Sequence, residues 1–200
     1  MRQDAKAARQ QQIEEAAYAV LEEKGFAGAS MLAIARKARA SNETLYNWYG
    51  DKTGLFKALV ARNAAEVRGL LEARIAAGGD AVETLGAFGP PLLAMLTGDR
   101  AVALNRAAAA DASGTLGQAI AEEGRERVAP LILQVLDQAR AQGHIGFSDP
   151  AEALDLYLGL LIGDLQIRRV IGRLNTLTGP ECQARSDRAL QALRRVLNLG

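Results

Sequence analysis

The segment at residues 41–49, SNETLYNWY, concentrates polar side chains that can form directional hydrogen bonds. In a helix, its outer face would offer amide, carboxylate and hydroxyl groups suited to the edges of nucleic-acid bases, from Asn42, Glu43, Thr44 and Asn47. Other nearby donors suit phosphate oxygens, namely Ser41, Tyr46 and Lys52. Lys52 would also lie in the first turn of the next helix, where free backbone amides favour an anion.

These side chains can act together only if short helices hold them in place. Ser30 can N-cap a helix over residues 30–38, with Ile34 and Ala35 among its apolar positions. After a tight connection at residues 39–40, Ser41 can cap the next helix. This spacing is typical of a helix-turn-helix, whose second helix enters the major groove of DNA. An ordinary helical hairpin with a polar outer face fits the same spacing, so both interpretations stay open at this point.

The rest of the chain predicts helices and no strand. Apolar residues recur at helical spacing from Ile13 to a terminating Gly25, and again from about residue 52 to Gly78-Gly79. Further amphipathic segments run over residues 80–97, 99–111, 115–142, 149–172 and 180–197. Pro90-Pro91 should kink or split the first of these, because proline lacks the helical amide donor. The sequence therefore predicts an all-α protein with about nine helices.

Composition narrows the functional classes. The 200 residues are 49% hydrophobic and 24% charged, which is typical of a globular protein with a sizeable core. A single cysteine, Cys182, allows no intramolecular disulfide, and with a single histidine, His144, it leaves no zinc cluster. No signal peptide or membrane span is recognisable. We expect a soluble cytoplasmic protein without metal or cofactor.

The two ends of the chain differ in character. Residues 1–62 hold ten Lys and Arg against seven Asp and Glu, and six of the nine aromatic residues. The remainder holds 14 against 16 and is mainly aliphatic. We expect a small basic domain at residues 1–52, a linking helix at about 52–77, and a larger helical domain within residues 53–200. The charge surplus alone is weak evidence for nucleic acid.

Residues 9–60 closely resemble the DNA-binding domain of the TetR/AcrR transcriptional regulators. The shared pattern comprises a hydroxyl residue opening the second helix, an Ile-Ala pair, a serine, a Thr-Leu-Tyr core, an aromatic residue, a lysine and a Leu-Phe pair. In this chain these positions are Ser30, Ile34-Ala35, Ser41, Thr44-Leu45-Tyr46, Tyr49, Lys52 and Leu55-Phe56. The resemblance implies DNA contacts from Ser30, Ser41, Asn42, Glu43, Thr44, Tyr46, Asn47, Trp48 and Lys52.

The chain departs from that pattern at several positions. Arg39 stands where the family usually has a turn glycine, so it must form the turn without glycine's freedom. Glu43 replaces a small residue; phosphates repel its carboxylate, which can instead accept a hydrogen bond from a cytosine amino group. Trp48 replaces a smaller aromatic or a histidine, and it could pack or contact the DNA backbone. The basic N-terminus, with Arg2, Lys6 and Arg9, could follow DNA or remain solvated.

The C-terminal part is similar in layout to the ligand-binding and dimerisation domain of such regulators, and to the AefR-like subgroup in particular. The resemblance implies a homodimer that binds a pseudo-palindromic double-stranded operator and is released by a small effector. Residues 156–165 are apolar on nearly every face, as expected for a helix covered on both sides. The predicted dimer interface comprises Leu158, Leu161, Ile162, Leu165, Leu190, Leu193 and Leu197. A buried central helix in a monomer is the alternative.

The predicted effector pocket is mostly aliphatic, which favours a small apolar effector. Its predicted lining comprises Phe88, Leu92, Leu96, Asn105, Val135, Tyr157 and Asp164. A dry core, with the two polar groups satisfied internally, fits the same residues. A helical enzyme or an interaction module that does not bind DNA is also conceivable, since Glu152, Asp155 and Asp164 share one segment. No base–nucleophile pair, phosphate loop or metal-ligand set supports catalysis, so we expect no enzyme.

Overall fold

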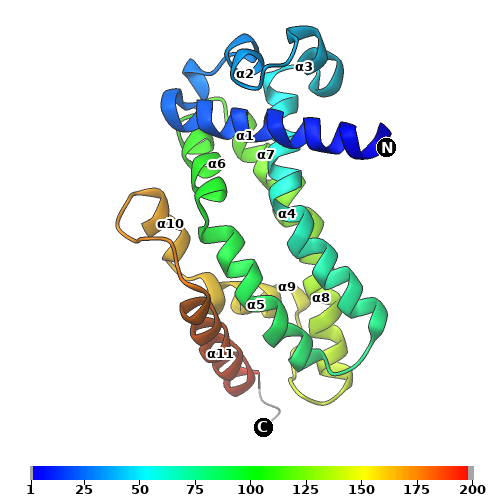
Figure 1. Ribbon diagram of the computed structural model, residues 1–200. Helices are drawn as coiled ribbons and strands as arrows, with labels where there is room; N and C mark the ends of the chain where they lie inside the picture. Colours follow the sequence, from blue (N-terminus) through cyan, green and yellow to red (C-terminus); the bar gives the residue numbers. More distant parts are fainter. Residues whose placement is uncertain (1, 198–200) are drawn as a thin grey trace. The chain divides into compact units, whose positions relative to one another are not determined.

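The computed structural model describes the backbone of residues 2–197 and the side chains from residue 5 onward, and within this range it is helical and without strands (Figure 1). The first four helices are α1 (Arg2–Gly28), α2 (Met31–Lys37), α3 (Asn42–Tyr49) and α4 (Lys52–Ala77). They are followed by α5 (Ala81–Thr97), α6 (Asp99–Ala109), α7 (Thr115–Ile120), a π-helical turn (Ala121–Arg125), α8 (Glu126–Ala141), α9 (Pro150–Ile162), α10 (Leu165–Val170) and α11 (Gly179–Val196). No described helix combines the length and apolar character needed to cross a membrane.

The chain forms two compact units. Unit 1 comprises the chain up to Arg62 together with Ala103–Glu123, and unit 2 comprises Asn63–Val102 and the chain from Gly124 onward. This division differs from the boundary expected at residue 52. The reason is that α6 and α7 place Leu104 and Leu116 in the core of unit 1, although the sequence assigned them to the C-terminal domain.

The core of unit 1 explains how its short helices are held. Ile34 of α2 and Leu45 of α3 are buried, although each lies on a helix with an exposed outer face. They join one apolar cluster with residues of α1 and α4, including Ile13 and Phe56. Most of the stability of helices this short must come from such burial, because isolated helices of this length are marginal in water.

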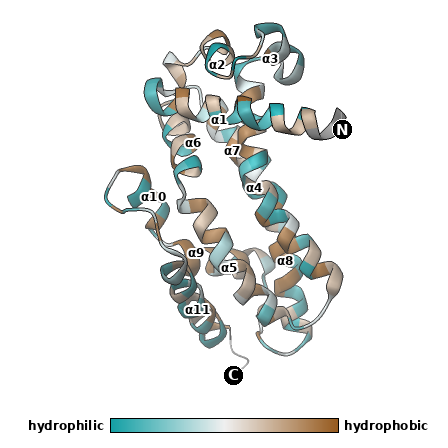
Figure 2. Cartoon of the chain, in the orientation of Figure 1, coloured by the Kyte–Doolittle hydropathy of each residue, from teal (hydrophilic) through white to brown (hydrophobic). Residues whose placement is uncertain are grey.

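Unit 2 is a helical assembly in which α5 and α9 are both strongly apolar (Figure 2). Helix α11 packs on α5 and α9, and α8 packs on the same two helices. At the contact between α5 and α11, a Cβ atom on Gly89 would lie 2.1 Å from Ser186 Oγ. Glycine is therefore required at residue 89 for these two helices to approach as they do.

Several helix boundaries differ from those predicted. The helix expected over residues 149–172 is two helices, because Gly163, at φ +52°, ends α9. The helix expected over 115–142 is interrupted by the π-helical turn. Helix α5 continues through Pro90-Pro91, so the predicted split is wrong; burial of Phe88 and Leu92 on either side stabilises the continuous helix. Gly25 has the positive φ expected of a helix end, although a further helical turn follows it.

Candidate nucleic-acid interface

Both helices of the predicted helix-turn-helix begin at the predicted serines. Ser30 Oγ accepts a hydrogen bond from the Ala33 amide at 3.1 Å, and Ser41 Oγ accepts one from the Thr44 amide at 3.0 Å. Ser41 Oγ also lies 2.7 Å from Thr44 Oγ1, so these two hydroxyls are paired with each other. The N-caps fix where α2 and α3 start, and therefore which residues of α3 point away from the core.

Helix α3 has one buried face and one exposed face. Leu45 is fully buried, while Thr44 and Trp48 are half-buried. The predicted contact residues that are exposed together are Ser41, Asn42, Glu43, Tyr46 and Asn47. This surface therefore presents neutral amides and hydroxyls with a single carboxylate, as a helix that reads base edges would.

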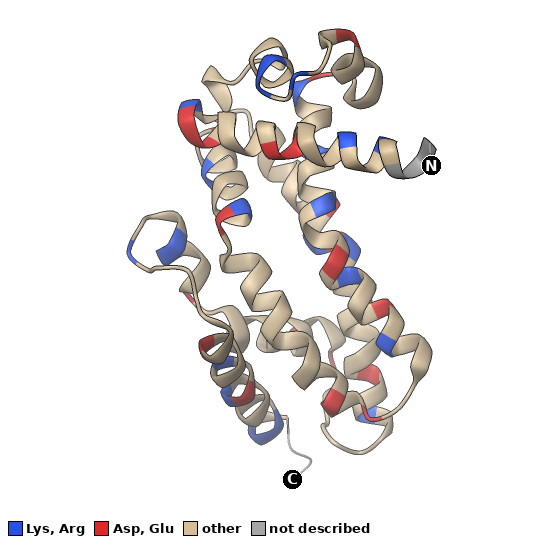
Figure 3. Ribbon diagram, in the orientation of Figure 1, with Lys and Arg blue, Asp and Glu red and all other residues tan. Residues whose placement is uncertain are grey.

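The charges near α3 are arranged around it more than on it. The described charge on α3 is Glu43 alone, whereas the end of α2 carries Arg36 and Lys37, both exposed (Figure 3). Lys37 forms an ion pair with Glu23, and this hydrogen bond lowers the pKa of the glutamate. Cations beside a helix that carries no cation of its own suit phosphate binding next to base reading.

The connection between α2 and α3 is a Schellman motif with arginine in the position usually taken by glycine. The Ala40 amide donates to the Ala35 carbonyl at 2.9 Å, and the Arg39 amide donates to the Arg36 carbonyl at 3.1 Å. Arg39 adopts φ +51° and is the one non-glycine residue with positive φ in the described chain. The turn expected from the sequence is therefore present, and it carries the backbone strain that the missing glycine implied.

Lys52 has internal partners that the sequence did not predict. Its ammonium donates to the carbonyls of Phe26 at 2.8 Å and Ala29 at 3.1 Å, and lies 4.2 Å from the centre of the Phe26 ring. Two of its three donors thus hold the end of α1 against the start of α4. One donor remains for a phosphate oxygen, and the predicted DNA contact stays a prediction.

Trp48 and Tyr49 close the C-terminal end of α3 against unit 1. Their rings meet edge to face at 6.5 Å, and the Lys6 ammonium lies 5.8 Å from the centre of the Trp48 ring. Burial and the nearby Glu14 carboxylate raise the pKa of Tyr49 to about 12. The Tyr49 hydroxyl is buried without a hydrogen-bond partner among the described groups. Trp48 therefore packs against the unit at least in part, which the sequence had left open.

The basic N-terminus is part of helix α1 rather than an extended arm. The Arg2 side chain lies outside the described residues. The Arg9 guanidinium donates to the backbone carbonyls of Ala38 and Arg39 in the connection between α2 and α3. The sequence could not have revealed this partner, because Arg9 and Arg39 are 30 residues apart.

The predicted effector lining is only partly brought together. Buried Phe88, Leu92, Val135 and Tyr157, with half-buried Leu96, belong to one apolar cluster in unit 2. Of the two polar members, Asn105 belongs to unit 1, and Asp164 is exposed beside the end of α9, where it pairs loosely with Arg168 at 3.9 Å. The helix break at Gly163 is what turns Asp164 outward, and the continuous helix assumed from the sequence concealed it.

Two of the residues predicted for the dimer interface are buried within their own chain. Leu161 and Leu193 are 0% exposed and lie in the core of their own chain, so they offer no surface to a partner. The other predicted positions are half-buried at the edge of that core: Leu158, Ile162, Leu165, Leu190 and Leu197. The sequence showed that all of these residues are apolar. Helical periodicity could not show which of them face the core of their own chain and which face outward. Large exposed apolar residues that it missed include Ile167, Ile171 and Val196.

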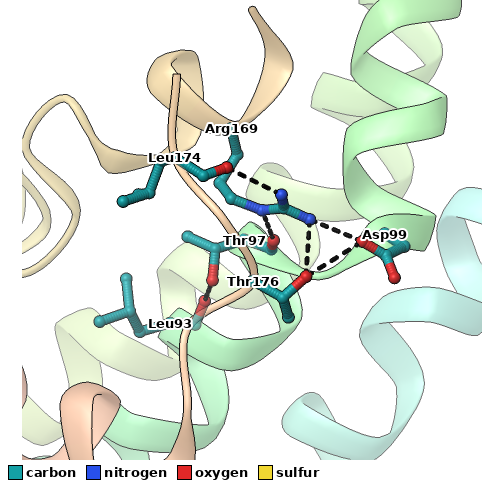
Figure 4. A network of polar contacts seen from close by, with 6 residues as sticks. All are labelled: Leu93, Thr97, Asp99, Arg169, Leu174 and Thr176. Carbon is teal, nitrogen blue, oxygen red and sulfur yellow. Dashed lines mark hydrogen bonds and ion pairs between the residues drawn. The ribbon is translucent and has the colours of Figure 1, made fainter. Parts of the chain in front are cut away.

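A network around Arg169 ties α10 to the junction of α5 and α6 within unit 2 (Figure 4). Its guanidinium donates to the Thr97 carbonyl at 2.7 Å, the Leu174 carbonyl at 3.0 Å and Asp99 Oδ1 at 2.6 Å. Thr176 Oγ1 accepts a further bond at 3.0 Å. No sequence pattern predicted this network, because it joins residues 97–99 to residues 169–176, about 70 positions further along the chain.

Comparisons with known proteins agree with this geometry. The sequence pattern of "Bacterial regulatory proteins, tetR family" matches residues 13–59, and that of the "AefR-like transcriptional repressor, C-terminal domain" matches residues 83–195. No curated protein matches the chain.

Three solved structures are similar over nearly the whole chain, each at 27% sequence identity. A TetR-family protein from Mesorhizobium loti covers 96% of this chain and 98% of its own, with a TM-score of 0.78. The flavonoid-responsive regulator FrrA covers 95% and 97%, with a TM-score of 0.70. A TetR transcriptional regulator from Agrobacterium tumefaciens covers 94% and 93%, with a TM-score of 0.73.

Proposed function

The chain belongs to the TetR family of bacterial transcriptional regulators, with an AefR-like C-terminal domain, and we propose that it is a repressor that a small apolar effector releases from its operator. The family consists of DNA-binding regulators rather than enzymes. The observation that carries the proposal is the exposed polar face of α3, held by serine caps at the start of α2 and α3.

The proposed reading of DNA divides the residues into two groups. Asn42, Glu43, Thr44 and Asn47 meet base edges, because their amide, carboxylate and hydroxyl groups match the donors and acceptors in the major groove. Phosphate oxygens are met by Ser30, Ser41, Tyr46, Trp48 and the remaining donor of Lys52. The hydroxyls of Ser41 and Thr44 are paired with each other, so one must turn away before it binds DNA. The N-cap can survive this turn, because Ser41 Oγ acts in it as an acceptor.

The proposed assembly is a homodimer on a pseudo-palindrome. Two recognition helices would then enter successive major grooves, about 34–36 Å apart. The partner would lie on the outer face of α9 and α11, where Leu158 and Leu190 are half-buried and Gly159 is open. Leu161 and Leu193 support this surface from beneath.

The proposed effector is small and predominantly apolar. The cluster formed by Phe88, Leu92, Leu96, Val135 and Tyr157 supplies aliphatic and aromatic surface. Its polar group, the Tyr157 hydroxyl, donates a long hydrogen bond to the Leu85 carbonyl at 3.5 Å, and burial raises its pKa. A neutral phenol has one donor, so the Tyr157 oxygen remains as an acceptor for a donor group of the ligand. The relative FrrA responds to flavonoids, so flat phenolic compounds belong in the first screen beside aliphatic ones.

Selection from a pool of randomised 30-base-pair duplexes, using the full chain, tests this function. We expect one enriched pseudo-palindrome, bound as a dimer in the cytoplasmic range of salt concentration. Enrichment of a single half-site would contradict binding as a dimer. Enrichment of no sequence would overturn the proposal that α3 recognises specific bases. Compounds that raise the thermal stability of the protein are then tested for operator release. A tight sugar or polyanion as the releasing compound would overturn the apolar effector.

A further inference from the structure

The connection between α2 and α3 contains a strained residue with an exposed side chain. Arg39 has φ +51°, and its side chain is exposed. A side chain with a Cβ atom disfavours this left-handed conformation, which persists only where surrounding structure imposes it. The Schellman bonds hold this turn in part, and contacts from the surrounding structure can hold it further.

Arg9 is placed to do so. Its Nη1 donates to the Ala38 carbonyl at 3.2 Å, and its Nη2 donates to the Arg39 carbonyl. The Schellman bonds already occupy the carbonyls of Ala35 and Arg36. The two carbonyls that Arg9 binds, those of Ala38 and Arg39, lie later in the same turn, and the planar guanidinium can bind both at once.

The orientation of Arg9 is itself fixed. Nη1 also donates to Gln12 Oε1 at 2.8 Å, one turn further along α1. Beside this residue pair, Ile13 of α1 is fully buried in the core of unit 1. The guanidinium thus links α1, which is held in the core, to the connection that sets the direction of α3.

We propose that Arg9 is a positioning residue for DNA recognition: it locks Arg39 in the left-handed conformation and so sets the direction of α3. This inference rests on the proposed function, since it concerns the same DNA-reading helix. Arg9 acts through the backbone of residues 38–39 and needs no contact with DNA. A lysine does not reproduce this geometry, because Arg9 holds Gln12 and the two carbonyls with two separate nitrogens of one rigid plane, whereas an ammonium has a single nitrogen.

The experiment compares Arg9→Met and Arg9→Lys in the full chain, with the operator selected by the parent protein as the probe. We expect both variants to bind this duplex about tenfold more weakly. The dependence of affinity on salt should keep the parent's slope. A direct phosphate contact predicts the opposite pattern, in which Arg9→Lys binds like the parent and Arg9→Met lowers the slope by about 1. That pattern would overturn the proposal.

Arg39→Gly supplies the matched background. Glycine adopts positive φ without strain, so removing Arg9 should cost clearly less affinity in Arg39→Gly than in the parent. An equal loss in both backgrounds would mean that Arg9 does not act through this turn. Comparing each double variant with Arg39→Gly itself cancels any effect of the lost Arg39 charge.

Amide hydrogen exchange provides a readout without DNA. The Ala40 amide, which bonds the Ala35 carbonyl, reports directly on the turn. We expect faster exchange at residues 38–41 in Arg9→Met and Arg9→Lys, with unchanged exchange in α9 as the control for folding. Unchanged exchange at residues 38–41 overturns the role of Arg9 even if DNA binding falls. If the parent selects no DNA sequence, the proposed function fails, while the exchange data still decide the role of Arg9.

Discussion

Arg169 Nη2 lies 2.6 Å from Asp99 Oδ1, yet the Arg169 side chain is 11% exposed and that of Asp99 is 86% exposed. The two members of this ion pair therefore stand in different surroundings. Asp99 stays hydrated if its partner is lost. The Arg169 guanidinium is mostly buried, and the carbonyls of Thr97 and Leu174 lose a hydrogen-bond donor if it is removed.

This asymmetry predicts unequal effects of removing either partner. Arg169→Met leaves two partly buried carbonyls without this donor, and we expect it to lower the free energy of unfolding by about 1–3 kcal/mol. Asp99→Asn removes an exposed charge and should cost less than about 1 kcal/mol. Urea unfolding of the full chain, followed by far-ultraviolet circular dichroism, measures both. Equal losses would show that the ion pair, rather than the carbonyl contacts, carries the stabilisation.

Gly159 offers a test of the dimer surface that spares the core. A Cβ atom at residue 159 meets nothing within 4 Å, and the same is true of Gly69 on α4. We expect Gly159→Arg to fold normally but to become monomeric, because the new side chain would stand where the partner packs. Gly69→Arg is the matched control and should remain dimeric. Sedimentation velocity distinguishes the two, and a dimeric Gly159→Arg would place the interface elsewhere.

Glu43 should determine specificity more than affinity. Among the described residues of α3, Glu43 is the one that carries a charge. Its carboxylate can accept a hydrogen bond from a cytosine amino group. We expect Glu43→Ala to lose about 1–3 kcal/mol of discrimination at one operator position while keeping the salt slope. Repeating the duplex selection with the variant measures this change. An unchanged selected sequence would exclude Glu43 from base reading.

Lys52→Met provides the contrast to Glu43→Ala. Loss of a phosphate contact should weaken binding to all duplexes evenly and reduce the salt slope by about 1. Loss of the bonds to the Phe26 and Ala29 carbonyls should also lower the thermal stability of the protein. A stability loss with an unchanged slope would assign Lys52 to the internal contacts alone.

The cap of α5 predicts a dependence of stability on pH. The Glu83 amide, which donates to Asp80, and the His144 side chain both hold the pKa of Asp80 below its ordinary value of 3.8. A carboxyl group whose pKa is lowered by folding stabilises the protein above its unfolded pKa, and this contribution is lost as the pH falls through the folded pKa. Asp80→Asn can still cap the helix but does not titrate near this pH.

We therefore expect the thermal stability of Asp80→Asn to fall less steeply than that of the parent as the pH drops below about 4. Thermal unfolding at several pH values between neutral and acid measures the two slopes. Parallel slopes would mean that other carboxylates account for the acid sensitivity.

The elements that local patterns control could be predicted from the sequence. Ser30 and Ser41 cap their helices as expected, because an N-cap depends on the residue and on amides a few positions away. The buried position of Leu45 follows from helical spacing in the same way. For such residues, the cause and its effect lie within one or two turns of the chain.

What could not be predicted depends on partners far away in the sequence. Periodicity identified Leu161 as apolar, but only the packing of α9 on α5 and α11 shows that it faces its own core. Asp164 was predicted as a lining residue because the sequence suggested one continuous helix, whereas Gly163 ends α9 just before it. Lys52 and Arg9 looked like free cations, because nothing local reveals a carbonyl more than twenty residues away.

Unit 1 is made from two separate stretches of chain, and this has a consequence for exchanging parts between regulators. A chimera joined at Arg62 would graft the DNA-reading helices onto a foreign α6 and α7. Leu104, Ala107, Leu116 and Ala119 would then be replaced, although they complete the core beneath those helices. A modular swap that retains function has to carry Ala103–Glu123 along with the N-terminal segment. Recombination at a single crossover point is thus disfavoured, and new pairings of operator and effector are more accessible through substitutions on the exposed face of α3.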